Sequence, residues 1–223
     1  MLESIRTRAS WLIAPRTLSL GINEVHVWRA SLEIPVAQLE SLQHNLSKDE
    51  LERAEHFHFW VNRRDFIAGR GVLREILSRY LGDQPDRLRF RYGSKGKPEL
   101  DEEINQDRIS FNLSHSHGLA ICALTCERRI GIDVEYIGSD VSIERLAQYF
   151  SPREVATLNE LSGREKRNAF FACWTRKEAY LKAIGEGLSV DLSAFEVPAS
   201  AAEPTVPLSV GNDLTEDSHW SLR

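Results

Sequence analysis

The sequence predicts an α+β fold made of two similar α/β subdomains related by pseudo-two-fold symmetry. Its 223 residues suffice for one large domain or two small ones. Each half begins with a strand-like segment, passes through helices and ends with strand-like material, although no residue-level repeat connects them. We expect residues 1–127 and 128–223 to form the two subdomains, with the functional site in the cleft between them.

The first half opens with a strand and a helix. Alternating apolar and polar residues over 22–34 predict the strand. A helix is expected over 46–57, because Ser47 and Glu50 have the three-residue spacing of a capping box.

A second helix is predicted over 63–82, where apolar residues recur on one helical face and Gly82 provides a stop. Gly69 and Gly71 weaken its middle, so a close neighbour is expected there. The apolar stripe consists of Phe66, Leu73, Ile76, Leu77 and Tyr80.

Strands are predicted to follow. Residues 87–100 alternate in polarity and then break into a Gly/Lys/Pro loop. Residues 109–125 predict a hairpin that turns at 116–118. The next segment, GIDVEYI at 131–137, is predicted to be a further strand because apolar residues alternate through it.

The rest of the second half is predicted to be helical. The stretch 142–161 is broken at Ser151, a suitable N-cap, and Pro152, a suitable first residue of a new helix. A long helix over 164–187 is closed by glycines. The tail over 198–217, rich in Ala, Pro, Ser and acidic residues, is predicted to be a loop.

Composition restricts the class of protein. A net charge of −5 gives no general attraction for nucleic acid, although ten Lys and Arg against four Asp and Glu between residues 62 and 97 would suit an anionic ligand or a solvated helix face. The three cysteines form neither a disulfide framework nor a zinc pattern. Neither a signal peptide nor a membrane span is expected, so we predict a cytoplasmic protein without membrane contact.

The segment GIDVEYI places two carboxylates one residue apart. On a strand, Asp133 and Glu135 would point to the same side, where like charges repel. Either this side faces open water or a cation lies between the two groups.

The long helix contains a second polar group. Trp174, Glu178 and Lys182 follow one another at four-residue intervals and so lie near one face. By default such a Glu–Lys pair is a surface ion pair worth about 0.3–0.5 kcal/mol. With Asp133 and Glu135, however, Glu178 would complete an all-oxygen site of the kind that suits magnesium, and nearby lysines would neutralise phosphate oxygens. The combination predicts chemistry on a diphosphate.

Four stretches together resemble the larger, Sfp-type, two-half class of 4'-phosphopantetheinyl transferases: GKPEL, FNLSHS, GIDVE and FFACWTRKEAYLKAIGEGL. The resemblance spans about residues 45–195, and the joint occurrence of GIDVE and WTRKEAYLK is its most specific part. It implies a magnesium-dependent holo-[carrier protein] synthase. Such an enzyme moves the 4'-phosphopantetheine arm of coenzyme A to a serine of an apo acyl or peptidyl carrier protein and releases 3',5'-ADP.

The resemblance also implies residue roles. It gives Asp133, Glu135 and Glu178 as metal ligands, with Glu178 or a water molecule as general base. Lys182 would stabilise or protonate the departing phosphate, so that Glu178, Lys182 and Asp133 form the catalytic group. The residues expected to contact coenzyme A are Lys97, Pro98, Ser114, His115 and Lys177, with Arg64 and Arg70 for its 3'-phosphate.

Two other functions remain open from sequence: a different magnesium enzyme acting on a small diphosphate, and a non-catalytic module that binds coenzyme A or a carrier protein. The three acids together with Lys182 argue against a non-catalytic binding module. The joint presence of FNLSHS and GKPEL argues against a different magnesium enzyme. We expect a monomer, because this class holds its whole site in one chain. Family members usually continue beyond HWSLR, so the second subdomain is expected to be truncated.

Overall fold

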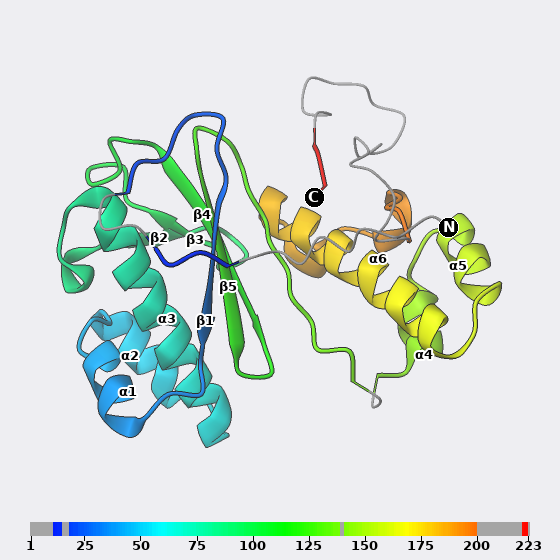
Figure 1. Ribbon diagram of the computed structural model, residues 1–223, viewed down its shortest axis with the longest axis horizontal. Helices are drawn as coiled ribbons and strands as arrows, with labels where there is room; N and C mark the ends of the chain where they lie inside the picture. The colour runs from blue at the N-terminus through cyan, green and yellow to red at the C-terminus, as the bar shows by residue number, and fades with distance from the viewer. Residues whose placement is uncertain (1–10, 15–17, 139–140, 200–219, 223) are drawn as a thin grey trace.

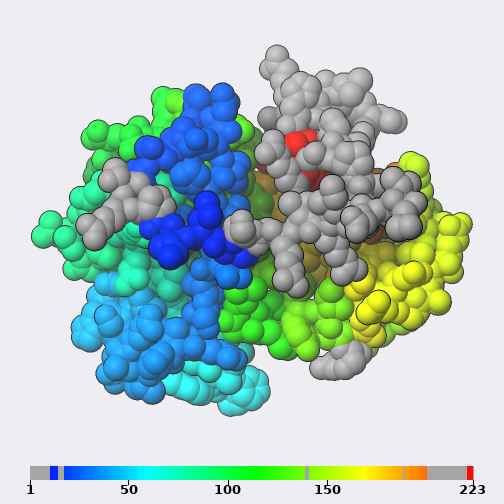
Figure 2. Space-filling view, in the orientation of Figure 1, coloured from blue at the N-terminus to red at the C-terminus, as the bar shows by residue number. Residues whose placement is uncertain are grey.

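The structure is a computed structural model that describes residues 11–14, 18–138, 141–199 and 220–222. Most of the predicted loop over 198–217 lies outside these residues. The fold is mixed α/β, as predicted. Figure 1 shows the sheet of strands β1, β4 and β5 between helix α3 on one side and helix α6 on the other. In the space-filling view of Figure 2, the first half, blue to green, lies beside the yellow-green to yellow helices of the second half.

The first half contains three helices and five strands among its described residues. Their bounds are β1 (His26–Ser31), α1 (Val36–Gln43), α2 (Lys48–Glu55), α3 (Trp60–Leu81), β2 (Phe90–Tyr92), β3 (Pro98–Leu100), β4 (Ile109–Ser116) and β5 (Leu119–Cys126).

The main sheet is antiparallel, in the order β1-β5-β4, so that β4 forms one edge. The predicted hairpin is confirmed: β4 and β5 pair in register from Ile109↔Cys126 to Ser116↔Leu119. The turn residues His117 and Gly118 have φ values of 47° and 72°, as a tight two-residue hairpin turn requires. The short strands β2 and β3 pair separately and carry the Gly/Lys/Pro loop between them.

Helix α3 covers one face of the sheet, and its leucines share a core with β4 and β5. The helix ends at Gly82, whose φ of 68° confirms the predicted stop. Helix α1 was not among the predicted elements, and it explains one of the two mid-helix glycines. A Cβ added to Gly71 would lie only 2.6 Å from the Cβ of Leu42 on α1, whereas at Gly69 the nearest contact would be an ordinary 3.7 Å.

The second half contains α4 (Ile143–Ala147), α5 (Pro152–Asn159) and α6 (Gly163–Ile184). The predicted break is confirmed: Ser151 caps α5, and its backbone N–H donates to Glu154 at 2.9 Å in a capping box. Within the described residues, this half shows only isolated bridge residues and short 3-10 turns besides its helices. The structure therefore supports a mixed α/β architecture without displaying a matching sheet in each half.

The prediction of a strand over 131–137 is wrong. The segment runs beside the edge strand β4, but it is not paired with it as a ladder. The physical reason is that backbone N–H groups of this segment donate to side-chain oxygens on β4, not to its carbonyls. The segment therefore stays close to the sheet without joining it.

Among the described residues, no helix has the length and apolar character needed to cross a membrane.

Candidate active site

Asp133 lies where the two halves meet. Its Oδ1 accepts hydrogen bonds from the Ser114 hydroxyl of β4 at 2.8 Å and from the Lys182 ammonium of α6 at 2.5 Å. The Lys182 ammonium also lies 2.9 Å from the Ser114 oxygen. Only 3% of the Asp133 side chain is exposed, and its Oδ2 is buried without a hydrogen-bond partner. One oxygen of this carboxylate is thus held by two hydrogen bonds, while the other oxygen is an acceptor without a donor.

Glu135 and Glu178 complete the acidic group. The Ser116 hydroxyl donates to Glu135 at 3.1 Å, so Glu135 faces β4 on the same side as Asp133, as the alternation predicted. Burial raises the pKa of Glu178, and the nearby Asp133 and Glu135 carboxylates raise it further, against the opposing effect of Lys182. Glu178 therefore lies within electrostatic reach of both acids.

Among the described residues, no three His, Cys, Asp or Glu side chains are grouped closely enough to bind a metal ion as they stand. One observation nevertheless fits a cation: the buried Asp133 Oδ2 lacks a hydrogen-bond partner, whereas the other oxygen of that carboxylate is held by Ser114 and Lys182. Carboxylate oxygens are the ligands that magnesium prefers.

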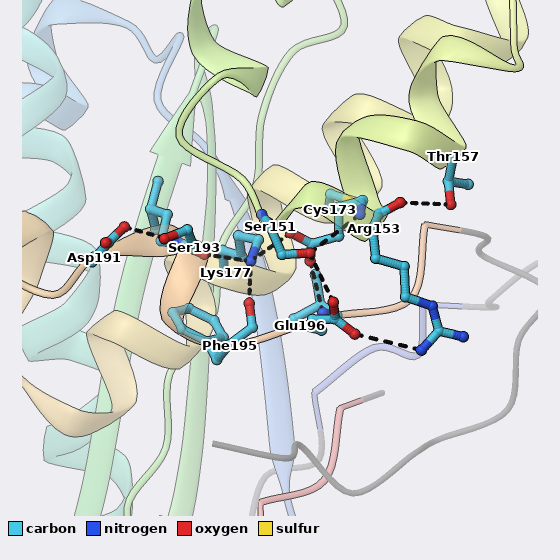
Figure 3. Close-up of polar contacts among 12 residues, drawn as sticks. Ser151, Arg153, Thr157, Cys173, Lys177, Asp191, Ser193, Phe195 and Glu196 are labelled. Carbon is cyan, nitrogen blue, oxygen red and sulfur yellow. Dashed lines mark hydrogen bonds and ion pairs between the residues drawn. The ribbon is translucent and has the colours of Figure 1, made fainter. Parts of the chain in front are cut away.

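Lys177 was predicted to contact the phosphate of coenzyme A, and the structure corrects this. Its ammonium is wholly buried and pairs with Glu154 at 2.9 Å. It also donates to the backbone carbonyls of Leu192 and Phe195, at 2.7 and 2.5 Å (Figure 3). An ammonium enclosed in this way cannot reach a bound ligand. Lys177 instead ties α6 to α5 and to the segment that follows α6.

Lys97 and Pro98 lie at the boundary of the halves. The Lys97 ammonium donates to the carbonyls of Ala183, near the end of α6, and Ile130, at 3.0 and 3.3 Å. Burial lowers the pKa of Lys97. Both residues line a cavity of about 460 Å³. Other residues around this cavity include Arg91, Arg129, Gly185 and Glu186.

His115 lies near the end of β4 and is exposed. Strand alternation places it on the opposite face of the sheet from Ser114. The structure thus separates the two neighbours that the sequence grouped: Ser114 contacts Asp133 and Lys182, and His115 points to the face covered by α3.

Arg64 and Arg70 both lie on α3. Arg64 bonds its neighbour Asp65 at 2.8 Å. Arg70 is buried and pairs with Glu50 at 3.3 Å, while its Nη1 has no hydrogen-bond partner. Burial lowers the pKa of Arg70 despite the opposing effect of Glu50.

Three residues of the site were missed from sequence. Asn112 and Ser116 flank Ser114 on one face of β4 and bond the acidic segment. The signal was present, because Asn112, Ser114 and Ser116 alternate with Phe111, Leu113 and His115 along the predicted strand. Gly131 is the third: a Cβ there would lie 1.9 Å from the carbonyl oxygen of Ala179 on α6. Only glycine lets the acidic segment approach the helix so closely.

Comparisons with known proteins identify the family of this chain. A family model for the 4'-phosphopantetheinyl transferase superfamily matches residues 129–223, and one for the N-terminal part of a 4'-phosphopantetheinyl transferase matches residues 27–127. The chain is 46% identical over 196 residues to the 4'-phosphopantetheinyl transferase HetI of a Nostoc species, an alignment that covers 87% of this chain and 82% of HetI. It is 31% identical over 153 residues to Sfp of Bacillus subtilis, covering 68% and 66% of the two chains. It is 30% identical over 168 residues to gsp of Aneurinibacillus migulanus, covering 74% and 67%. The chain belongs to the 4'-phosphopantetheinyl transferase superfamily.

Proposed function

We propose that this protein transfers the 4'-phosphopantetheine arm of coenzyme A to a serine of an apo acyl or peptidyl carrier protein and releases 3',5'-ADP. Its family membership supports the reaction. The observation that carries the proposal is the meeting of Asp133, Glu178 and Lys182 at the boundary of the two halves. Carboxylates beside an ammonium suit the binding and cleavage of a diphosphate.

Glu178 is the proposed general base. Its raised pKa brings the carboxylate nearer to neutral pH, where a base accepts a proton most effectively. Glu178 takes the proton of the carrier serine as the serine oxygen attacks the β-phosphorus of coenzyme A. The new phosphorus–oxygen bond forms as the bond to the departing 3',5'-ADP breaks.

Lys182 is the proposed stabiliser of the leaving group. Its side chain remains 30% exposed, and an ammonium that donates to Asp133 and Ser114 has a third N–H left for a ligand. A fixed positive charge there opposes the negative charge that builds on the departing phosphate. Asp133 in turn holds the ammonium in place.

Asp133, Glu135 and Glu178 are the residues that would hold Mg²⁺. The unpartnered Oδ2 of Asp133 supports this assignment. When bound, the ion supplies positive charge that polarises the diphosphate. The carboxylates of this chain bind and orient it.

We propose that Lys97, Pro98, Ser114 and His115 contact coenzyme A. The cavity beside Lys97 and Pro98 supports the first two. Arg64 and Arg70 are proposed for the 3'-phosphate, and the unused Nη1 donor of Arg70 supports its part.

We further propose two subdomains, 1–127 and 128–223, related by pseudo-two-fold symmetry around a cleft that holds the site. The ranges 27–127 and 129–223 of the two family models support this division. A cytoplasmic monomer is proposed as well. The three buried free cysteines favour a reducing compartment, and burial raises the pKa of the Cys122 thiol to about 12, which keeps it unreactive.

The test is direct. The protein is incubated with Mg²⁺, coenzyme A and an apo acyl or peptidyl carrier protein, and the carrier is weighed by mass spectrometry. We expect the carrier to gain one phosphopantetheine group at its serine, with 3',5'-ADP in the supernatant. Absence of a mass gain with several carriers would refute the proposal. Cleavage of coenzyme A without any carrier would instead indicate a hydrolytic magnesium enzyme.

Two isosteric variants test the assigned roles. Asp133→Asn and Glu178→Gln should both abolish transfer while their thermal unfolding remains cooperative. For Glu178→Gln, loss of a general base predicts a kcat about 10²–10⁴-fold lower. Near-normal turnover by either variant would show that the acid group is wrongly assigned.

A further inference from the structure

The acidic segment 131–137 is held to the edge strand β4 by side chains that repeat every second residue. The backbone N–H groups of Ile132, Val134 and Tyr136 donate to Asn112, Ser114 and Ser116 at 2.8, 3.3 and 3.1 Å, respectively. Both segments advance by two residues from one bond to the next. The result is a ladder in which β4 contributes side chains where a normal sheet would contribute backbone carbonyls.

Each serine of this ladder bonds an acidic residue in the same way. Ser114 accepts from the backbone of Val134 and donates its proton to the carboxylate of Asp133, at 2.8 Å. Ser116 accepts from the backbone of Tyr136 and donates its proton to the carboxylate of Glu135, at 3.1 Å. A hydroxyl has one proton to give. Each serine therefore donates its hydroxyl proton to one oxygen of the carboxylate. This hydrogen bond fixes the direction in which the second oxygen of that carboxylate points.

Contacts at the two ends hold the ladder in register. At one end, Gly131 lies so close to α6 that no side chain would fit between them. At the other end, the ring of Tyr136 stacks on His117, with centroids 4.1 Å apart. These contacts oppose a two-residue slip of the acidic segment along β4, which would move one of the two acids into the position of the other.

We infer that Ser116 is a positioning residue that orients the Glu135 carboxylate toward a divalent cation, as Ser114 orients Asp133. Nothing buries Glu135, which is exposed, so without Ser116 its side chain would sample several rotamers. A hydrogen bond that orients a metal-binding carboxylate typically contributes about 10–100-fold in metal affinity. The inference rests on the proposed function, because it assumes that Glu135 is a metal ligand.

The test measures Mn²⁺ binding in the presence of coenzyme A without a carrier protein, from the electron paramagnetic resonance signal of free Mn²⁺. Ser116→Ala should weaken binding about tenfold, and Ser116→Thr, which keeps the hydroxyl, should restore it. In a double-mutant cycle, Ser116→Ala should have little further effect once Glu135→Gln is present, because the serine acts through that carboxylate. Hydrogen exchange of the Tyr136 amide should become about fivefold faster in Ser116→Ala, as the loss of one hydrogen bond predicts.

Ser31→Ala is the matched control. Ser31 lies on β1 at the same level of the sheet, opposite Leu119, and its hydroxyl bonds the backbone of Glu33. This variant should bind Mn²⁺ normally. Unchanged Mn²⁺ binding in Ser116→Ala, an equal loss in the Glu135→Gln background, or no Mn²⁺ binding by the unmodified protein would each overturn the inference. None of these readouts requires transfer, so they distinguish its failure from failure of the proposed reaction.

Discussion

Two lysines on helix α6 each pair with a buried carboxylate, but the lysines themselves differ in exposure. Lys177 and Lys182 are five residues apart, which separates them by about 140° around the helix. Lys177 and its partner Glu154 are 0% and 4% exposed, whereas Lys182 and its partner Asp133 are 30% and 3% exposed. The Lys177–Glu154 pair is fully buried, whereas the lysine of the Lys182–Asp133 pair is partly exposed to solvent.

The pairs also differ in how fully their hydrogen bonds are satisfied. Glu154 accepts from the backbone of Ser151 and Val197 as well as from Lys177, so both of its oxygens are used. Asp133 has a buried oxygen without any partner. A buried charge with unused capacity is costly unless a ligand supplies the missing contact. The comparison indicates that the completed pair stabilises the fold and the incomplete pair serves the site.

The largest expected effect comes from breaking the completed pair. Lys177→Met should lower the free energy of unfolding by about 3–5 kcal/mol, because it leaves the Glu154 carboxylate buried without a counter-charge. Urea unfolding followed by circular dichroism measures this. Combining Lys177→Met with Glu154→Gln should recover part of the loss, since no uncompensated charge then remains. A loss below 1 kcal/mol for Lys177→Met would contradict the structural role.

Lys182→Met is the opposite experiment on the same helix. It should lower kcat for carrier modification about 10²–10³-fold, because a preorganised charge at the leaving group is lost. We expect KM for coenzyme A to change much less. The variant also leaves Asp133, only 3% exposed, without its counter-charge, so it should lose stability. We expect a smaller loss than for Lys177→Met, because the partly exposed side of the pair lets water reach the carboxylate. An effect confined to KM would assign Lys182 to substrate binding only.

Gly131→Ala tests whether the Asp133–Lys182 pair depends on the close packing of the acidic segment against α6. The new methyl group would overlap the backbone of Ala179, so α6 or the acidic segment must shift. We expect a cost of about 1–3 kcal/mol in unfolding free energy and a lower transfer rate, since Asp133 lies two residues away. Gly69→Ala on α3 is the control: its Cβ has ordinary space, so it should be neutral or slightly stabilising. Equal behaviour of the two alanine variants would contradict the proposed close approach.

The smallest effect concerns pH. The folded-state pKa of Glu178 is raised above its ordinary value of 4.5, so its stabilising contribution is fully present below about that pH and is lost as pH rises through the raised pKa. Glu178→Gln mimics the protonated form. Its stability should match that of the unmodified protein near pH 4 and exceed it increasingly toward neutral pH. Urea unfolding between pH 4 and 8, with EDTA present, checks the trend, and a pH-independent difference would contradict it.

Local signals in the sequence predicted much of the fold. The Ser151 cap with Pro152, the glycine stops of α3 and α6, and the hairpin around His117 each depend on residues close together in the chain. Helix α1 was missed, because its helical character depends on burying Leu39 and Leu42 under α3. The strand predicted at 131–137 was wrong because the alternation that defines a strand also suits an extended segment held by side chains.

The sequence by itself determined which residue types were available: the alternating acids Asp133 and Glu135, the helix with Glu178 and Lys182, and the motifs that place the chain in its family. Only the tertiary structure decided which lysine is enclosed and which is open, and that serines of β4 hold the acids. The physical reason is that burial and charge compensation come from partners far away in the chain. Lys177 and Lys182 lie five residues apart on one helix, and their roles diverge because α6 presents one to the core and the other to the sheet.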